Sequence, residues 1–176
     1  MEHQKPSVFA FNTFLRSLLE PKFGPLGEVQ KHKLNYSAWR LGIATTGEPP
    51  FEADILAYPL GPFIAELGKQ PNRDGDTSTL SAADRNLCLV VASRLGGISG
   101  KRLALRSHTK YPEWYAARKG LAPTQSGNRR ITVETVRNAT FLAPKNERVI
   151  EADDKKVIMK WNAQFHVWNF TVEGAR

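Results

Sequence analysis

The sequence predicts a mainly α-helical (α+β) protein, with one helical domain over residues 7–142 and a β-rich extension over residues 143–176. Two patterns lead to this prediction. Apolar side chains recur at spacings of three and four through most of the first range, with Pro and Gly between the segments. In the second range, polar residues alternate with apolar ones, which is the period of a half-buried strand: Trp161, Ala163, Phe165 and Val167.

The first predicted helix covers residues 7–20. Five apolar side chains fall on one face of it and are expected to pack in the core: Phe11, Phe14, Leu15, Leu18 and Leu19. Pro21 is expected to end this helix, because proline has no N–H to donate. A second helix is predicted over residues 28–44, with Tyr36 and Trp39 on the flanks of its apolar stripe.

A proline-rich turn is predicted after the second helix, over residues 47–51 (GEPPF). It cannot be helical throughout, because Pro50 lacks an N–H and holds Pro49 in an extended conformation. Residues 55–58 are expected to be extended. The pair at 61–62, Gly-Pro, is expected to open a further helix, since a proline in the first turn loses no hydrogen bond.

The second half of the helical domain is expected to begin after an exposed polar loop at residues 70–79. Ser81 can cap the following helix, with acidic Asp84 in its first turn. Gly96 and Gly97 are expected to end that helix in a left-handed conformation. Three shorter helices are expected to follow: residues 100–108, capped by Ser99, a segment beginning at Pro112, and residues 132–142.

The extension is expected to form a β-hairpin or strand appendage. Short apolar runs at residues 149–150 and 157–159 flank a turn at Asp153 and Asp154. The alternating strand that follows would leave an aromatic edge, which needs a cover. Either the helical core or a partner protein is expected to supply that cover.

Charge is unevenly distributed along the chain, whose formal net charge is +8. Residues 81–142 hold eleven basic and three acidic groups, whereas residues 43–80 hold two basic and six acidic groups. A basic patch attracts nucleic acids through the release of counterions, and it attracts acidic proteins equally well. Charge alone therefore does not choose between these partners.

Cysteine usage and hydropathy bear on the compartment. The single cysteine, Cys88, excludes an intrachain disulfide and a cysteine-based metal site, and it suits the cytoplasm. No apolar run reaches the roughly 18 residues of a membrane span. The N-terminal residues lack the pattern of a signal peptide. We expect a cytoplasmic protein without membrane association.

The chemistry-bearing residues do not form a recognised catalytic or cofactor motif. The glycines at 96–100 fail as a phosphate loop, because Arg102 stands where a Ser or Thr would hold magnesium. The histidines lack metal-ligand spacing, and no Gly-x-Ser-x-Gly elbow is present. Glu48, Glu52 and Asp54 are interpreted as part of a solvated loop. We expect no metal, no cofactor and no enzymatic activity.

Two groups of motifs, in order, resemble the Panacea domain of SocA-like antitoxins and phage-associated proteins. The first group is Lys33-Leu34-Asn35-Tyr36, Trp39, residues 47–51, residues 55–58, Gly61-Pro62 and Glu66-Leu67. The second is residues 103–108 (LALRSH), Pro112-Glu113-Trp114 and Ile131-Thr132. Two departures occur in the second group: Ser107 replaces the usual Thr, and one extra residue separates Pro112 from Trp114. The resemblance covers about residues 11–142.

What the resemblance implies is an antitoxin in a bacterial or phage-infected cell. Such a protein binds and neutralises a cognate toxin encoded beside it, or delivers that toxin to a protease. Self-association is left open. The helical core is expected to be the scaffold, and the strand over residues 161–170 is the preferred candidate for the contact surface. Partner contacts are expected from aromatic side chains and one histidine, with core packing as the alternative for several: Tyr36, Trp39, Tyr58, His108, Trp114, Trp161, Phe165 and Trp168.

Two other functions remain as alternatives. A basic nucleic-acid-binding regulator would use the cationic side chains of the second half as phosphate contacts: Arg102, Arg106, Lys110, Arg118, Arg129 and Arg130. A hydrolase would pair His108 with an acid from residues 48–54. For His108 the simpler interpretation is a structural histidine that joins two short helices.

Overall fold

A computed structural model describes residues 5–127 and 129–140 with their side chains, and the backbone of residues 147–152, 155–162 and 167–174. The chain divides into two compact units, Met1–Val136 and Arg137–Arg176. The mainly helical, α+β fold class is confirmed. None of the helices in the described part is both long enough and apolar enough to cross a membrane.

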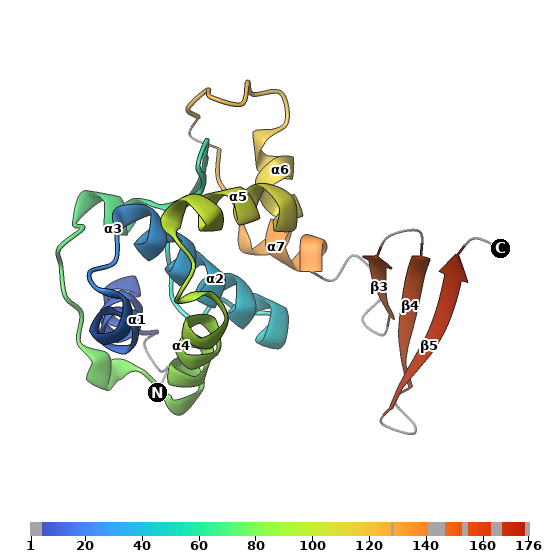
Figure 1. Cartoon of the computed structure of the whole chain (residues 1–176), viewed down its shortest axis with the longest axis horizontal. Helices are drawn as coiled ribbons and strands as arrows, with labels where there is room; N and C mark the ends of the chain where they lie inside the picture. Colours follow the sequence, from blue (N-terminus) through green and yellow to red (C-terminus); the bar gives the residue numbers. More distant parts are fainter. Residues whose placement is uncertain (1–4, 128, 141–146, 153–154, 163–166, 175–176) are drawn as a thin grey trace. The chain divides into compact units, whose positions relative to one another are not determined.

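The first unit consists of helices and one short hairpin (Figure 1). Its helices are α1 (Val8–Phe23), α2 (Glu28–Thr46), α3 (Ala65–Lys69), a 3-10 turn at Thr77–Thr79, α4 (Ala82–Leu95), α5 (Gly100–Lys110), α6 (Pro112–Arg118) and the start of α7 (Val133–Thr140). The hairpin pairs β1 (Ile55–Tyr58) with β2 (Gly61–Ile64) in antiparallel register.

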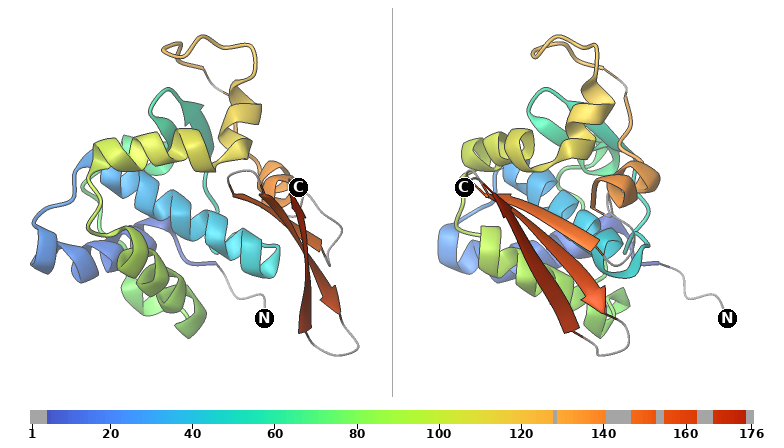
Figure 2. Two further views of the ribbon diagram at one scale, coloured as in Figure 1. Left: turned by 45° about the vertical axis from the view of Figure 1, so that its right-hand side comes forward. Right: turned by 90° about the vertical axis from the view of Figure 1, so that its right-hand side faces the viewer.

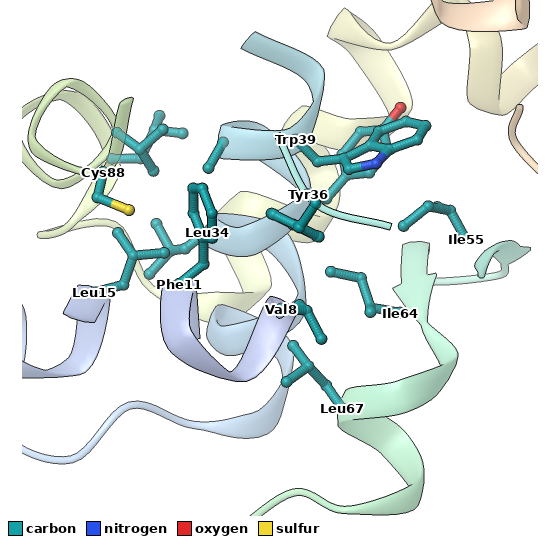
Figure 3. Close-up of a cluster of buried hydrophobic side chains, with 14 of the residues drawn as sticks. Val8, Phe11, Leu15, Leu34, Tyr36, Trp39, Ile55, Ile64, Leu67 and Cys88 are labelled. Atoms are coloured by element: carbon teal, nitrogen blue, oxygen red, sulfur yellow. The ribbon is translucent and has the colours of Figure 1, made fainter. Parts of the chain in front are cut away.

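Helix α2 is the centre of this unit. It packs against α1, α4, α5 and β2, and the two views of Figure 2 show it enclosed by these elements. Every residue from 31 to 39 is buried, polar ones included. The core side chains converge on it from the surrounding elements (Figure 3), among them Phe11, Leu15, Ile55, Ile64 and Cys88. A helix buried all round is expected to carry few charges, so its charged residues need partners.

The structure confirms the predicted caps but corrects two helix ends. Ser81 accepts from the Asp84 N–H in a capping box, and Ser99 accepts from the Arg102 N–H. Pro21 does not end α1, which continues to Phe23 and stops at Gly24, with φ 78°. A proline near a helix C-terminus removes only its own N–H, and the Gly24 N–H still bonds the Glu20 carbonyl at 3.0 Å.

The left-handed ending predicted for α4 is also wrong. Gly96 has right-handed φ −59° and ψ −36°. A Cβ at this position would lie 2.2 Å from Leu19 Cδ2 and 2.5 Å from the Ala92 carbonyl oxygen. Glycine is therefore needed here because α1 approaches closely, and not because of its backbone angles.

Gly61 and Pro62 open a strand, not the predicted helix. Gly61 has φ +100°, which completes the tight turn after Tyr58. Pro62 lies opposite Ala57 in a sheet of two strands, where a missing N–H on the outer edge costs no ladder bond. The helix begins only at Ala65.

The second unit contains an antiparallel sheet in the order β3 (Glu147–Ala152), β4 (Lys155–Asn162) and β5 (Val167–Gly174). The first two strands pair as a hairpin requires, and the third strand was not predicted. Of the predicted strand over residues 160–167, Lys160 to Asn162 belong to β4 and Val167 begins β5. The turn at Asp153 and Asp154, and Ala163 to His166, lie outside the described residues.

Candidate functional site at the hairpin and the second helix

The hairpin β1–β2 is fixed by side chains from three helices. Trp114 Nε1 on α6 donates to the Tyr58 carbonyl at 2.9 Å. His108 Nε2 on α5 lies 2.9 Å from the Pro59 carbonyl, which can only accept, so this nitrogen carries the proton. Lys33 Nζ on α2 donates to the Pro62 carbonyl at 2.8 Å. The two motif groups, far apart in sequence, therefore meet at this hairpin.

His32 anchors the far strand of the hairpin. Its Nδ1 accepts from the Ile64 N–H at 3.1 Å, so the remaining proton lies on Nε2. Burial, with smaller effects of Lys33 and other neighbouring charges, lowers the pKa of His32 to about 4. The ring stacks on Phe63 at 4.2 Å, and Phe63 stacks on Tyr58 at 4.6 Å. Three parallel rings thus stand beside the hairpin.

A cavity of about 600 Å³ lies between these rings and the start of α2. Its wall is predominantly apolar, with His32 and Lys33 as its buried polar members. The described residues that line it are Glu28, Val29, His32, Lys33, Tyr58, Pro59, Leu60, Gly61, Phe63, Gly68 and Pro71. This volume is in the range of pockets that hold small organic ligands, roughly 300–1,000 Å³.

Lys33 has an unusual environment for a lysine. The residue is only 4% exposed, and burial lowers the pKa of its amine to about 7. Within the described part of the chain its amine, which has three donors when charged, makes one hydrogen bond, to the Pro62 carbonyl. Among the described residues no carboxylate forms an ion pair with it.

A buried polar network joins α2 to α6. Tyr36 Oη donates to Glu113 Oε1 at 2.7 Å, and Arg40 Nε donates to the same oxygen at 2.6 Å. Glu113 is 1% exposed. Burial and the Glu113 charge raise the pKa of Tyr36 well above its usual value. Because one carboxylate serves two donors from α2, this network locks α6 in place.

The predicted partner-binding residues differ in how far they are exposed and in which unit they belong to. Tyr36, Trp39 and Trp114 are 0%, 2% and 6% exposed, so they belong to the core and present almost nothing to a partner on the folded body. Tyr58 and His108 are half-buried at the hairpin, where the His108 ring stacks on Trp114 at 4.3 Å. Trp161 and Trp168 are backbone partners in β4 and β5, and Phe165 lies outside the described residues.

The predicted phosphate contacts also differ from one another. Arg102, Arg106 and Lys110 are exposed on α5, and Arg129 is exposed in the loop before α7. Arg118 is buried and donates to the carbonyls of Ala57, Ala122, Pro123 and Gln125 at 2.8 to 3.1 Å. Its guanidinium therefore holds a loop together, and its burial keeps it from a phosphate.

Two carboxylates of residues 48–54 form ion pairs while remaining partly exposed to solvent. Glu52 pairs with Lys5 at 2.8 Å, and Asp54 pairs with Arg130 at 3.0 Å. No pocket is predicted here from the sequence, but a cavity of about 410 Å³ is lined by both carboxylates, Glu66 and Trp39. The Trp39 indole N–H is buried and has no hydrogen-bond partner among the described residues.

The sequence motifs include Lys33, but they assign neither Lys33 nor His32 to a site. Lys33 stands in the motif Lys-Leu-x-Tyr, next to the apolar Leu34. The signal that marks Lys33 is a charged side chain within a run of residues that the sequence pattern predicts to be buried. Arg40 and Glu113 were missed as a pair because 73 residues separate them.

No group of three or more metal-ligating side chains occurs among the residues with described positions. Comparisons with known proteins found no matching family model, no matching curated protein and no matching solved structure. What this protein does is therefore inferred from its own residues and geometry.

Proposed function

We propose that this protein is an antitoxin that neutralises a cognate toxin by direct binding, or delivers that toxin to a protease, in the cytoplasm. The proposal includes no catalytic step, no cofactor and no metal. The helical unit serves as the scaffold, and its exposed apolar side chains serve as the contact surface. This proposal rests on the resemblance to the Panacea domain together with the geometry of the hairpin.

The single observation that supports the proposal most is the way the two motif groups interlock. Trp114 of the second group donates to the Tyr58 carbonyl of the first, His108 donates to Pro59 in the turn between two parts of the first group, and Tyr36 donates to Glu113. A pattern whose parts contact one another in three dimensions is more specific than the same residues scattered over a fold. The motif residues therefore pack together in one structural unit, as expected of residues that form a scaffold common to a family.

A contact surface is available at the same place. Leu60, Leu105 and Tyr115 are 60%, 63% and 61% exposed, and they belong to the hairpin, α5 and α6, which contact one another. Exposed large apolar and aromatic side chains are typical of protein–protein contact sites. We infer that the toxin contacts this hairpin face, defined by Leu60, Leu105 and Tyr115.

Co-expression tests the proposal. The neighbouring reading frame is expressed alone, with this protein, and with the variants Leu105→Asp and Tyr115→Ala. We expect arrested growth that the wild type restores, co-purification of the two proteins, and weaker rescue by both variants. Leu89→Asp on α4 is the matched control, because Leu89 is 47% exposed but lies outside the hairpin face. No rescue and no co-purification would remove the proposal.

A nucleic-acid-binding regulator is the second candidate. Arg102, Arg106 and Lys110 recur every four residues on the exposed side of α5, a spacing that places them on one helix face. Binding to duplex DNA is measured across a salt series. A steep loss of affinity with salt favours this candidate, and a flat response at low salt excludes it.

A further inference from the structure

The cavity beside the hairpin contains a buried cation without a counter-ion. Lys33 Nζ bonds one carbonyl, that of Pro62, and no carboxylate in the described part of the chain pairs with it. Burying a charge is costly unless it is paired, and the lowered pKa near 7 reflects this cost. An anion placed beside the amine would remove that penalty.

The wall of the cavity is predominantly apolar. The stacked rings of Tyr58, Phe63 and His32 form one side, and Val29, Leu60 and Pro71 contribute further apolar surface. His32 also provides a potential donor, because its Nδ1 accepts from the backbone and its proton therefore lies on Nε2. A cation within an apolar wall complements a ligand that has an anionic group and an apolar part.

Two glycines keep this arrangement open. A Cβ on Gly61 would lie 2.9 Å from Lys33 Cε and 2.8 Å from Ser107 Cβ, so a side chain there would displace the amine. A Cβ on Gly68 would lie 2.2 Å from the Phe63 ring, which needs that space to stack between His32 and Tyr58. Both glycines line the cavity.

We propose that this cavity is a binding site for a small amphiphilic carboxylic acid, whose carboxylate pairs with Lys33 and whose apolar part fills the space between the hairpin and α2. Glu28 is the one carboxylate in the lining, and it is already paired with Lys31 at 2.7 Å. It therefore opposes an incoming anion only weakly. This site shares Leu60 with the toxin contact proposed above, but the binding of a small acid does not depend on that contact.

Calorimetric titration of the full chain with matched probes tests the proposal. Hexanoate and 4-phenylbutanoate are compared at pH 6 with their uncharged amides, hexanamide and 4-phenylbutanamide. The acid of each pair should bind at least tenfold more tightly than its amide, because only the acid offers an anion to Lys33. Equal affinities for acid and amide, or no binding of either acid at millimolar concentration, would overturn the proposal.

Three variants locate the site. Lys33→Met keeps a long side chain but removes the charge, and it should abolish the preference for the acid. Leu60→Asp places a negative charge at the exposed rim of the cavity and should weaken acid binding at least fivefold. Leu105→Asp is the control, because Leu105 is equally exposed but does not line the cavity, and it should leave binding unchanged.

The rim variant keeps the test decisive if Lys33→Met fails to fold. Circular dichroism establishes folding for each variant before titration. Acid binding that Leu60→Asp and Leu105→Asp affect equally would overturn the proposal, as would an acid preference that survives in folded Lys33→Met.

Discussion

At the scale of single residues, Lys33 is the most informative side chain. Its amine is held beside the hairpin by one carbonyl, and burial lowers its pKa from 10.5 to about 7. In the unfolded chain the same amine keeps its ordinary pKa. Between about pH 7 and pH 10.5 the unfolded state therefore binds more protons than the folded state, and stability rises with pH across this window.

This linkage gives the first prediction. The unfolding free energy of wild type minus that of Lys33→Met should increase by about 1 kcal/mol per pH unit between pH 7 and pH 10. The difference removes contributions common to both proteins, such as the ionisation of Cys88. Urea denaturation at pH 7, 8, 9 and 10 measures it. A difference that stays constant with pH would show that Lys33 is charged and solvated in the folded protein.

Cys88 gives a second prediction at this scale. The thiol is fully buried in the core, and burial raises its pKa to about 12. Since the thiolate is the reactive form, the folded protein should react with a maleimide far more slowly than the protein in urea. Mass spectrometry of timed samples measures both rates. Comparable rates in the two conditions would contradict the burial of this side chain.

At the scale of elements, the fold depends on how α6 is held against α2. Arg40 and Tyr36 share one carboxylate oxygen of Glu113, and the ring of Tyr111 lies under the Arg40 guanidinium at 5.0 Å. Removing one partner from a buried ion pair leaves an uncompensated charge, which costs more than the net contribution of the pair. The locking role of the network can therefore be tested by truncating one member at a time.

Glu113→Ala should destabilise the protein by about 3–5 kcal/mol, because Arg40 is then left partly buried without a counter-ion. Tyr36→Phe should cost about 1.5–3 kcal/mol, the range for a hydrogen bond to a charged group. Chemical denaturation measures both. The order of the two effects is the test: a larger loss for Tyr36→Phe than for Glu113→Ala would contradict the account.

The junction of α1 and α4 supplies a prediction with a built-in control. Gly96→Ala introduces a Cβ that collides with Leu19 and the Ala92 carbonyl, so it should cost about 1–3 kcal/mol. In Gly97→Ala the new Cβ would lie 3.5 Å from the Phe23 ring, an ordinary contact, and the change should be close to neutral. Thermal unfolding compares the two. Equal shifts in Tm would indicate that close approach is not the reason for Gly96.

How far the sequence predicts these elements depends on whether a signal is local. Ser81 and Ser99 reveal their helix starts because a cap depends on the next three residues. Gly96 and Pro62 were misread because their roles come from Leu19 on another helix and from Ala57 on the opposite strand. The same limit hid the cavity, whose walls come from α2, the hairpin and α3.

At the scale of the whole molecule, we propose that the helical unit acts by binding a toxin. Tyr36 and Trp39, expected as possible contacts, are used to build its interior, whereas Leu60, Leu105 and Tyr115 remain on its surface. Sequence patterns could not separate these two groups, because the type of an aromatic or apolar residue does not reveal whether its side chain is buried or exposed. Which side chains face outward is decided only by how the helices pack.

The most direct measurement of this central claim is a titration of the purified full chain with the purified product of the neighbouring reading frame. Calorimetry at physiological salt should show a single defined stoichiometry with a Kd below about 1 μM. Such a Kd is typical of a specific protein–protein interface of ordinary size. Leu105→Asp and Tyr115→Ala should weaken it, while Leu89→Asp should not. No detectable heat and separate elution of the two proteins in size-exclusion chromatography would contradict the account.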